Sequence, residues 1–271
     1  MDNRPIGVFD SGLGGLTTVS ELRRIMPNEN IIYFGDTGRV PYGTRSRETI
    51  QKYAKQDINF LLSKGVKLVI TACNTASSVI TDEMIATLEV EYTGVIMPAT
   101  YVAASSTKNK RIGVIGTPAT IRSGAYEKAL TKMDSEIQVY SNACPLFVPL
   151  VENGFIQHDN QVTRLVAEQY LAPLKEKGVD TLILGCTHYP IIKHIIGDIM
   201  GAHVTLIDSG QEAARLANEL LTKKDMLNQT KMVAQCKYYI SDTVKSFTQN
   251  ATLILNEEID GHVEKIDIET F

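Results

Sequence analysis

An internal repeat constrains the fold of this 271-residue chain more than any other feature. The segment from Lys64, KGVKLVITACNTA, matches the segment from Lys177, KGVDTLILGCTHY, with Lys, Gly, Val, Ile and Cys identical in register. RPIGVFDSG from Arg4 likewise resembles KRIGVIGTP from Lys110, which shares Ile-Gly-Val. The copies lie roughly 110 residues apart, so each is long enough to form its own covered sheet. The repeat therefore predicts two similar domains.

Short apolar runs alternate with segments of helical periodicity along most of the chain. Residues 50–61 place apolar side chains mostly three and four apart, which predicts an amphipathic helix, although Asp57 falls on its apolar face. Strands that alternate with helices are typical of βαβ units and parallel sheets. We therefore expect an α/β protein of two doubly wound domains, related by duplication, with its functional site at their interface. The predicted strands are Ile6–Phe9, Ile31–Phe34, Leu68–Thr71, Val95–Met97, Ile112–Ile115, Leu182–Leu184 and Val204–Ile207.

The repeat also sets the expected domain boundaries. The second domain is predicted to span residues 98–208 and to carry Cys186. A further helix, Gln211–Leu221, and a strand-like segment, Lys237–Ile240, follow the second copy. We assign both to the first domain, which then comprises residues 1–97 and 209–271 and carries Cys73. The chain is therefore expected to cross between the domains twice.

The composition excludes several classes of protein. Hydrophobic residues make up 44% and charged residues 21%, which is ordinary for a globular protein with a full core. The net charge is -4 and the basic residues are scattered, so no nucleic-acid partner is predicted. Neither a secretory leader nor an apolar run of ~20 residues is apparent, so we expect a cytoplasmic protein with no membrane partner.

Four cysteines occur without any CxxC pair, which argues against a zinc ribbon or a thioredoxin-type motif and predicts free thiols. Cys73 and Cys186 each follow a predicted strand, at the edge of a parallel sheet where ligands gather. Helix N-termini at such an edge are expected to lower a thiol's pKa and to attract carboxylates. Cys144 and Cys236 are interpreted as small buried hydrophobic residues. The predicted helix caps at the two sites are Asn74, Thr75, Ser77 and Thr187.

Two further residues have a context that suggests acid–base work. His188 lies two positions after Cys186 and is expected to position or protonate that thiol. Asp10 ends the first strand and is expected to do the corresponding work for Cys73; alternatively, it caps the turn into the helix that begins at Leu16. Unequal partners suit a pair in which one thiol abstracts a proton while the other donates one.

The glycine-rich segment DSGLGGLT, residues 10–17, is a weak candidate for nucleotide binding. Thr17 stands where the GxGxxG motif requires its third glycine, and the GK[ST] of a P-loop is missing. The glycines instead predict a tight turn in which the backbone approaches a ligand.

Five motifs, in this order along the chain, resemble those of the glutamate racemases within the aspartate/glutamate racemase superfamily. They are FDSGLGGLT (9–17), FGDTGRVPYGTRS (34–46), ACNTAS (72–77), GVIGTPATI (113–121) and GCTHYP (185–190). The resemblance implies an isomerase that interconverts L- and D-glutamate without a cofactor or metal, supplying D-glutamate for peptidoglycan synthesis and cell shape. It also implies a homodimer.

The family's functional residues can be carried onto matching positions of this sequence. By this resemblance, Cys73 and Cys186 exchange the roles of base and acid, assisted by Asp10 and His188. Asp36 and Glu152 match acidic positions of the family and are assigned no step. The implied substrate-binding residues are Asp10, Ser11, Tyr42, Gly43, Asn74, Thr75, Thr117, Thr120 and Thr187.

Two alternatives to a glutamate racemase remain open from the sequence. Paired cysteines at strand ends would also serve an aspartate racemase or another carboxylate isomerase, although the GCTHYP and VPYGTRS motifs favour glutamate. A non-enzymatic protein whose two domains close on an amino acid would leave both thiols inert. Such a binding protein predicts tight binding without loss of the α-hydrogen.

Overall fold

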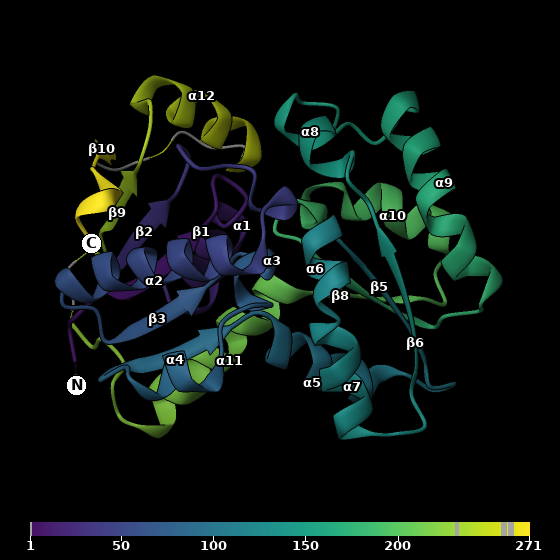
Figure 1. Ribbon diagram of the computed structural model, residues 1–271, viewed down its shortest axis with the longest axis horizontal. Helices are drawn as coiled ribbons and strands as arrows, with labels where there is room; N and C mark the ends of the chain where they lie inside the picture. The colour runs from purple at the N-terminus through teal and green to yellow at the C-terminus, as the bar shows by residue number, and fades with distance from the viewer. Residues whose placement is uncertain (1, 231–232, 256–258, 260–262) are drawn as a thin grey trace.

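The computed structural model describes residues 2–230, 233–255, 259 and 263–271. The polypeptide forms two α/β domains that lie side by side, with both ends of the chain in the same half (Figure 1). Each domain is built on a parallel sheet, and in the described part of the chain one sheet has six strands and the other four. This arrangement confirms the α/β prediction.

The first sheet has the strand order β10-β9-β2-β1-β3-β4. The β1 strand lies between β2 and β3, with Phe9 opposite both Phe34 and Thr71. All of these pairings are parallel, so the carboxyl ends of the strands share one edge. The bounds are β1 (Ile6–Asp10), β2 (Ile31–Gly35), β3 (Leu68–Thr71), β4 (Glu91–Gly94), β9 (Cys236–Ile240) and β10 (Val263–Lys265).

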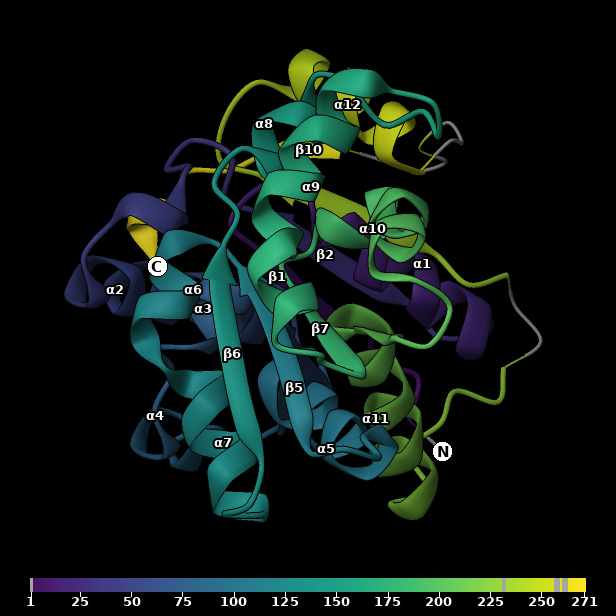
Figure 2. The ribbon, with the colours of Figure 1, turned by 90° about the vertical axis from the view of Figure 1, so that its right-hand side faces the viewer.

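The second sheet repeats the inner part of the first. Its order, β6-β5-β7-β8, corresponds strand for strand to β2-β1-β3-β4, as a duplication requires. Figure 2 shows β5 between β6 and β7. Gly116 of the central strand lies opposite Ala143 on one side and Gly185 on the other. The bounds are β5 (Arg111–Gly116), β6 (Gln138–Ala143), β7 (Thr181–Gly185) and β8 (Thr205–Asp208).

Helices cover both faces of the first sheet. One apolar cluster joins alternate strand residues such as Val8 and Tyr33 to α1, α11 and α12, and another joins Phe9 and Phe34 to α2. In α2, Ile50, Ala54, Phe60 and Leu61 of the predicted apolar stripe are buried, and Ile58 is buried with them. Complete burial of a leucine or isoleucine contributes about 1.5–3 kcal/mol. The bounds are α1 (Leu16–Ile25), η1 (Tyr42–Thr44), α2 (Arg47–Ser63), α3 (Asn74–Ser77), α4 (Asp82–Ala86), α11 (Ser209–Lys223), α12 (Val244–Leu255) and η3 (Ile268–Thr270).

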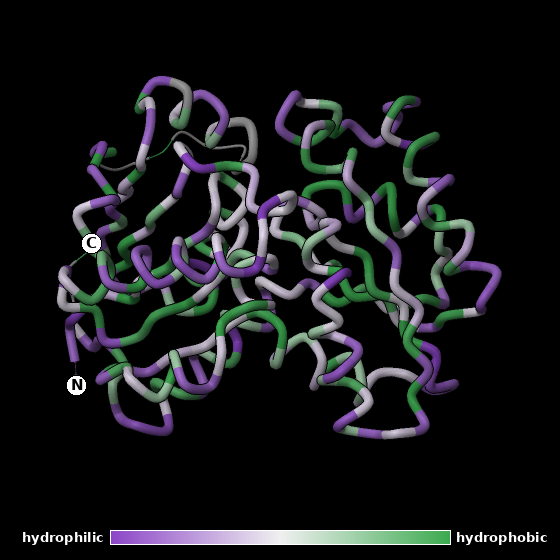
Figure 3. Tube along the Cα trace, viewed as in Figure 1, coloured by the Kyte–Doolittle hydropathy of each residue, from purple (hydrophilic) through white to green (hydrophobic). Residues whose placement is uncertain are grey.

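The second sheet is covered in the same manner. One face packs against α8, α9 and α10 through residues such as Leu184, and the other packs against α5 and α7 through Val114 and Ile183. Hydrophobic segments run along the strands inside both halves, while the outer helices are more mixed (Figure 3). The bounds are α5 (Ile96–Ser106), α6 (Pro118–Ser123), α7 (Ala125–Met133), α8 (Phe147–Glu152), α9 (Gln161–Glu176), η2 (Tyr189–Ile192) and α10 (Lys193–Met200).

The structure corrects one predicted strand. Residues 95–97 do not form a strand, because β4 ends at Gly94 and α5 begins at Ile96. A short apolar run has no periodicity that separates a strand from the start of a buried helix. Pro98 lies in the first turn of α5, where its missing N–H is not needed by the helix. The other six predicted strands overlap observed ones.

The chain passes from the first sheet to the second after β4 and returns through α11. The apolar side of α11, including Ala213, Ala217 and Leu221, packs into the core of the first sheet. The residue boundaries proposed for the two domains, at 97/98 and 208/209, stay a prediction. Within the described residues, no helix is long and apolar enough to cross a bilayer.

Candidate active site

A cavity of about 410 Å³ opens between the two domains. It lies where β3 and β7 end, so each sheet presents its carboxyl edge to the same space. Most of the residues predicted for the site meet there, although Asp10 and Thr120 lie just behind the wall. The lining includes Ser11, Tyr42, Gly43, Cys73, Asn74, Thr75, Thr117, Cys186, Thr187 and His188.

Cys73 enters the cavity from the first domain, two residues beyond β3. Its sulfur accepts a hydrogen bond from the backbone N–H of Ala76 at 3.4 Å and lies 3.5 Å from the Ser11 hydroxyl. The thiol is therefore itself the cap of α3, and the prediction that Asn74, Thr75 or Ser77 would cap this helix is wrong. The three side chains are already inside the helix, where they cannot reach the first free N–H groups.

The environment of Cys73 also corrects the expected direction of its pKa. Burial disfavours the thiolate, and with the nearby Asp10 it raises the pKa of Cys73 to about 12. The hydrogen bonds from Ser11 and Ala76 oppose this shift without outweighing it. The α3 helix is only four residues long, so its dipole is small. Without substrate, Cys73 is held as a neutral thiol at physiological pH.

Asp10 lies between the two halves of the site. Its Oδ2 accepts from the N–H of Gly12 at 2.9 Å, and its Oδ1 lies 3.5 Å from the Thr187 hydroxyl of the second domain. Burial raises the pKa of Asp10, while the neighbouring His188 acts in the opposite direction. The alternative interpretation of Asp10 holds in part: it stabilises the turn at Gly12, but α1 itself has no side-chain cap.

Cys186 enters from the second domain with a different set of partners. His188 Nδ1 lies 3.9 Å from the Cys186 sulfur, and His188 Nε2 lies 2.9 Å from Glu152 Oε1. Burial alone would lower the pKa of His188, but its contacts with Cys186 and Glu152 raise that pKa to about 10. The buried imidazole therefore carries a proton at neutral pH beside the thiol. Thr187 is not a helix cap, because the helical turn that follows begins after His188 and has no side-chain cap.

Three threonine hydroxyls meet across the domain boundary. Thr75 Oγ1 lies 2.8 Å from Thr117 Oγ1 and 3.1 Å from Thr120 Oγ1. Thr120 is buried behind the other two and reaches the site only through them. The cluster links the first turn of α3 to the first turn of α6 and gives the cavity a hydroxyl-rich wall.

The glycine-rich turn begins at the cavity, where Ser11 and Gly12 line the wall, and then packs against the second domain at Gly14. A Cβ on Gly14 would lie 2.2 Å from the Thr187 hydroxyl and 2.5 Å from the His188 ring, so only glycine fits. Thr17 Oγ1 also lies 3.1 Å from the Thr187 carbonyl oxygen. The turn therefore packs the first domain against residues 187–188 of the second.

One wall of the cavity was not predicted from the sequence. Cys144, Val148, Pro149 and Glu152 line it from the loop after β6 and from α8. Of these residues, Glu152 makes the specific contact, through His188. The repeat could have predicted the strand that leads to this wall. Its first copies begin at Arg4 and Lys110, 106 residues apart, so the counterpart of β2 (residues 31–35) is expected at 137–141, close to the observed β6.

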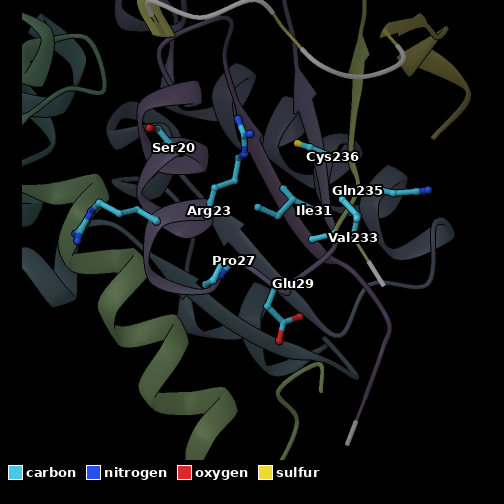
Figure 4. Close-up of a pocket in the computed structure, with 10 residues that line it drawn as sticks. Ser20, Arg23, Pro27, Glu29, Ile31, Val233, Gln235 and Cys236 are labelled. Atoms are coloured by element: carbon cyan, nitrogen blue, oxygen red, sulfur yellow. The ribbon is translucent and has the colours of Figure 1, made fainter. Parts of the chain in front are cut away.

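A second cavity, of about 440 Å³, lies between the end of α1 and the start of β9 (Figure 4). Arg23, Glu29 and Cys236 are among its lining residues. It is at the amino-terminal end of β2 and β9, the opposite sheet edge from the thiol pair. Among the described residues, no group of three or more His, Cys, Asp or Glu side chains is arranged to hold a metal ion.

Comparisons with known proteins agree with this geometry. Residues 16–217 match the family model described as Asp/Glu/Hydantoin racemase. The glutamate racemase of Geobacter metallireducens is 44% identical over 98% of this chain and 97% of its own length. The glutamate racemase of Chlorobaculum tepidum is 47% identical over 94% of this chain and 93% of its own.

A solved structure matches over the whole fold. The glutamate racemase of Francisella tularensis, crystallised in complex with D-glutamate, has a TM-score of 0.92 and 43% identity, and the match covers 100% of both chains. Identity of this extent, together with the paired thiols at the two sheet edges, shows that the chain is a racemase of the Asp/Glu/hydantoin racemase family, among its glutamate racemases.

Proposed function

We propose that this enzyme interconverts L- and D-glutamate by a two-base mechanism, with Cys73 and Cys186 as the two bases. The observation that carries the proposal is the meeting of two thiols, one from each duplicated sheet, in a single cavity. The thiols have unlike partners: Cys73 has Ser11 with Asp10 behind it, and Cys186 has His188 with Glu152. The substrate assignment follows the relatives, which are glutamate racemases.

The proton transfers balance without an outside reactant. One cysteine, as thiolate, takes the α-proton, and the electron pair of the C–H bond stays on the α-carbon. The other cysteine, as thiol, donates its proton to the opposite face of that carbon. After one turnover the two sulfurs have exchanged protonation states, and the reverse reaction starts from the state that the forward reaction leaves.

The remaining groups address the charges of the substrate. The hydroxyls of Thr75, Thr117 and Thr187 line the cavity and would donate to the substrate's carboxylates. Asp10, behind the wall beside Thr187, would favour the substrate's ammonium group when ionised. His188, held as a cation by Glu152, places a positive charge beside the Cys186 sulfur. Closure of the two domains around the substrate would exclude water from the carbanion.

The same proposal includes the cellular setting. D-glutamate is a precursor of peptidoglycan, so the enzyme would supply cell-wall synthesis and cell shape from the cytoplasm. The reaction is proposed to need no cofactor, and the active form is proposed to be a homodimer.

Exchange of the α-hydrogen is the direct test. Proton NMR of L-glutamate in D2O with the pure, reduced enzyme should show loss of the α-proton signal, and chiral chromatography should show D-glutamate appearing. Cys73→Ser and Cys186→Ser should each abolish racemisation. Cys236→Ser is the matched control, because Cys236 lies at the distant end of β9 and should leave the rate unchanged.

Other outcomes separate the alternatives. Retention of racemisation in either active-site variant would exclude the two-thiol mechanism. Tight binding of glutamate with no exchange would support the binding protein. Exchange with aspartate but not with glutamate would move the substrate assignment to the other acidic amino acid.

A further inference from the structure

The rim of the cavity on the side of the first domain is formed by residues 36–46, here called the lip loop. Val40, Pro41, Tyr42, Gly43 and Thr44 of this loop all line the cavity. Its tip also touches the second domain, since a Cβ on Gly43 would lie 3.1 Å from the side chain of Thr117. The position of this loop therefore sets the width of the site.

A group of buried polar side chains lies beneath the lip loop. We call Asp36, Arg39, Tyr42 and Asp57 the anchor cluster. Arg39 Nε lies 2.6 Å from Asp36 Oδ2, and Arg39 Nη2 lies 2.9 Å from Asp57 Oδ1. Both carboxyl groups are fully buried, and the Tyr42 side chain is 1% exposed. Three of the four residues belong to the loop, whereas Asp57 comes from α2.

Counting protons within the cluster assigns one to Asp57. The Tyr42 hydroxyl contacts Asp36 Oδ2 closely and also lies 3.0 Å from Asp57 Oδ2. A phenol has a single proton to donate, so it can satisfy only one of the two carboxylates. The closer contact, with Asp36, takes this proton. The second contact is then a hydrogen bond only when Asp57 carries a proton and donates it to the phenol oxygen.

Counting charges also requires one proton on this pair of acids. With both acids ionised, the cluster would hold two negative charges against the single positive charge of Arg39, among side chains that are almost fully buried. With Asp57 protonated, Arg39 and Asp36 balance. Burial and the neighbouring Asp36 raise the pKa of Asp57 well above its ordinary value, and Arg39 and the contact with the Tyr42 hydroxyl only partly oppose this.

The charged groups around Asp57 come from several elements. Asp36, Arg39 and Tyr42 face it from the lip loop, and Asp10 acts on it from the end of β1. On the outer side, Glu269 of η3 lies 3.1 Å from Arg39 Nη1 and 3.9 Å from the ammonium group of Lys52. Near the end of the chain, η3 therefore contacts the arginine that holds the loop.

We propose that Asp57 is a protonated positioning residue which, together with Arg39 and the outer contact of Glu269, holds the lip loop in the geometry that binds substrate. This inference rests on the proposed function, because it concerns the same cavity. It assigns a role to three residues that do not line the cavity, Arg39, Asp57 and Glu269, the last of them in η3.

Asp57→Asn and Asp57→Leu form the decisive pair of variants. Asparagine reproduces the inferred pattern, because its oxygen accepts from Arg39 and its NH₂ group donates to the Tyr42 oxygen. Leucine has a similar volume and makes neither bond. The KM for glutamate should stay within about twofold of wild type in Asp57→Asn and rise about tenfold in Asp57→Leu, with kcat changed less than KM.

An infrared difference spectrum between wild type and Asp57→Asn at neutral pH gives an independent readout. The wild type should show the C=O stretch of a protonated carboxyl group, shifted in D2O, that the variant lacks. If Asp57→Asn instead lost a band of an ionised carboxylate, the inference would be overturned. An equal rise of KM in Asp57→Asn and Asp57→Leu would also overturn it. The spectrum does not depend on racemisation, so it tests the cluster even if the proposed function fails.

Glu269→Gln keeps the test open if Asp57→Leu does not fold. Glu269 is 56% exposed, so its replacement should leave the fold intact and raise KM by only about two- to threefold. Lys245→Gln, a surface change on α12, is its control. An unchanged KM in Glu269→Gln would show that the contact between Glu269 and Arg39 does not help to hold the lip loop.

Discussion

The hydroxyl of Tyr126 donates a hydrogen bond of 2.5 Å to Asn74 Oδ1, and the two residues come from different domains. Asn74 Nδ2 in turn donates to the Ser209 hydroxyl at 3.1 Å, which donates to the Leu184 carbonyl at 3.0 Å. These contacts fix which end of the Asn74 amide faces which neighbour. One N–H of the amide remains for a ligand. The residue next to Cys73 is thus oriented by the opposite half of the molecule.

Tyr126→Phe should therefore weaken catalysis through Asn74. It leaves a buried amide oxygen without its donor, which costs about 1–3 kcal/mol. We expect kcat/KM for glutamate to fall by about tenfold and the free energy of unfolding to fall by about 1 kcal/mol. Tyr140→Phe is the matched control, because the Tyr140 hydroxyl donates to Gln138 on the half-exposed strand β6, away from the cavity. Equal kinetics in both variants would show that the orientation of Asn74 is irrelevant.

The pairing of His188 with Glu152 predicts a pH dependence. The pKa of His188 is raised from 6.5 to about 10, so the stability it contributes is complete below pH 6.5 and is lost as pH rises through about 10. Glu152→Gln should lower the pKa of His188, since it removes a carboxylate that favours the cation. Nitrogen-15 NMR of the histidine ring measures both titrations. A wild-type midpoint near pH 6.5 would contradict the ion pair.

Cys73 should react slowly with iodoacetamide in the absence of substrate. Only the thiolate is nucleophilic, and burial beside Asp10 raises the pKa of Cys73 to about 12. Alkylation followed by peptide mass spectrometry should show a rate at Cys73 that keeps rising with pH through the whole range in which the enzyme is folded. A rate that levels off near pH 7 would mean that the free enzyme already holds a thiolate there.

A buried ion pair at the opposite sheet edge predicts a large effect on stability. Lys67 Nζ lies 2.6 Å from Glu29 Oε2, and both side chains are almost fully buried. Lys67→Met would leave the Glu29 charge unpaired, so the free energy of unfolding should fall by about 3–5 kcal/mol. The double variant with Glu29→Gln should recover much of this loss. Urea denaturation measures both, and equal losses in the single and double variants would argue against the unpaired charge as the cause.

Much of the fold could be predicted because the repeat and the apolar runs are local signals. β3 was predicted to the residue, since Leu68–Thr71 is a buried run between a glycine turn and small polar residues. β6 was missed because its sequence, QVYSNA, is that of a half-exposed edge strand with few apolar residues. The same omission hid α8 and therefore the contact of Glu152 with His188.

The meeting of the predicted site residues in one cavity followed from a general rule, that parallel strands present their carboxyl ends to ligands. Their electrostatics did not follow. A helix N-terminus lowers the pKa of a thiol, whereas burial raises it, and burial cannot be read from the sequence around one cysteine. Cys73 is buried, so its pKa rises. The role of Asp57 on the apolar face of α2 could not be predicted, because its partner, Arg39, comes from another segment of the chain.

The return of the chain to its first sheet has a consequence for synthesis on the ribosome. β2 pairs with β9, so the outer edge of β2 stays open until about 200 further residues have been made. All four strands of the second sheet, by contrast, come from one continuous stretch, residues 111–208. That half can therefore complete its sheet first, while the earlier half waits with an exposed strand edge that a chaperone or a neighbouring nascent chain can reach.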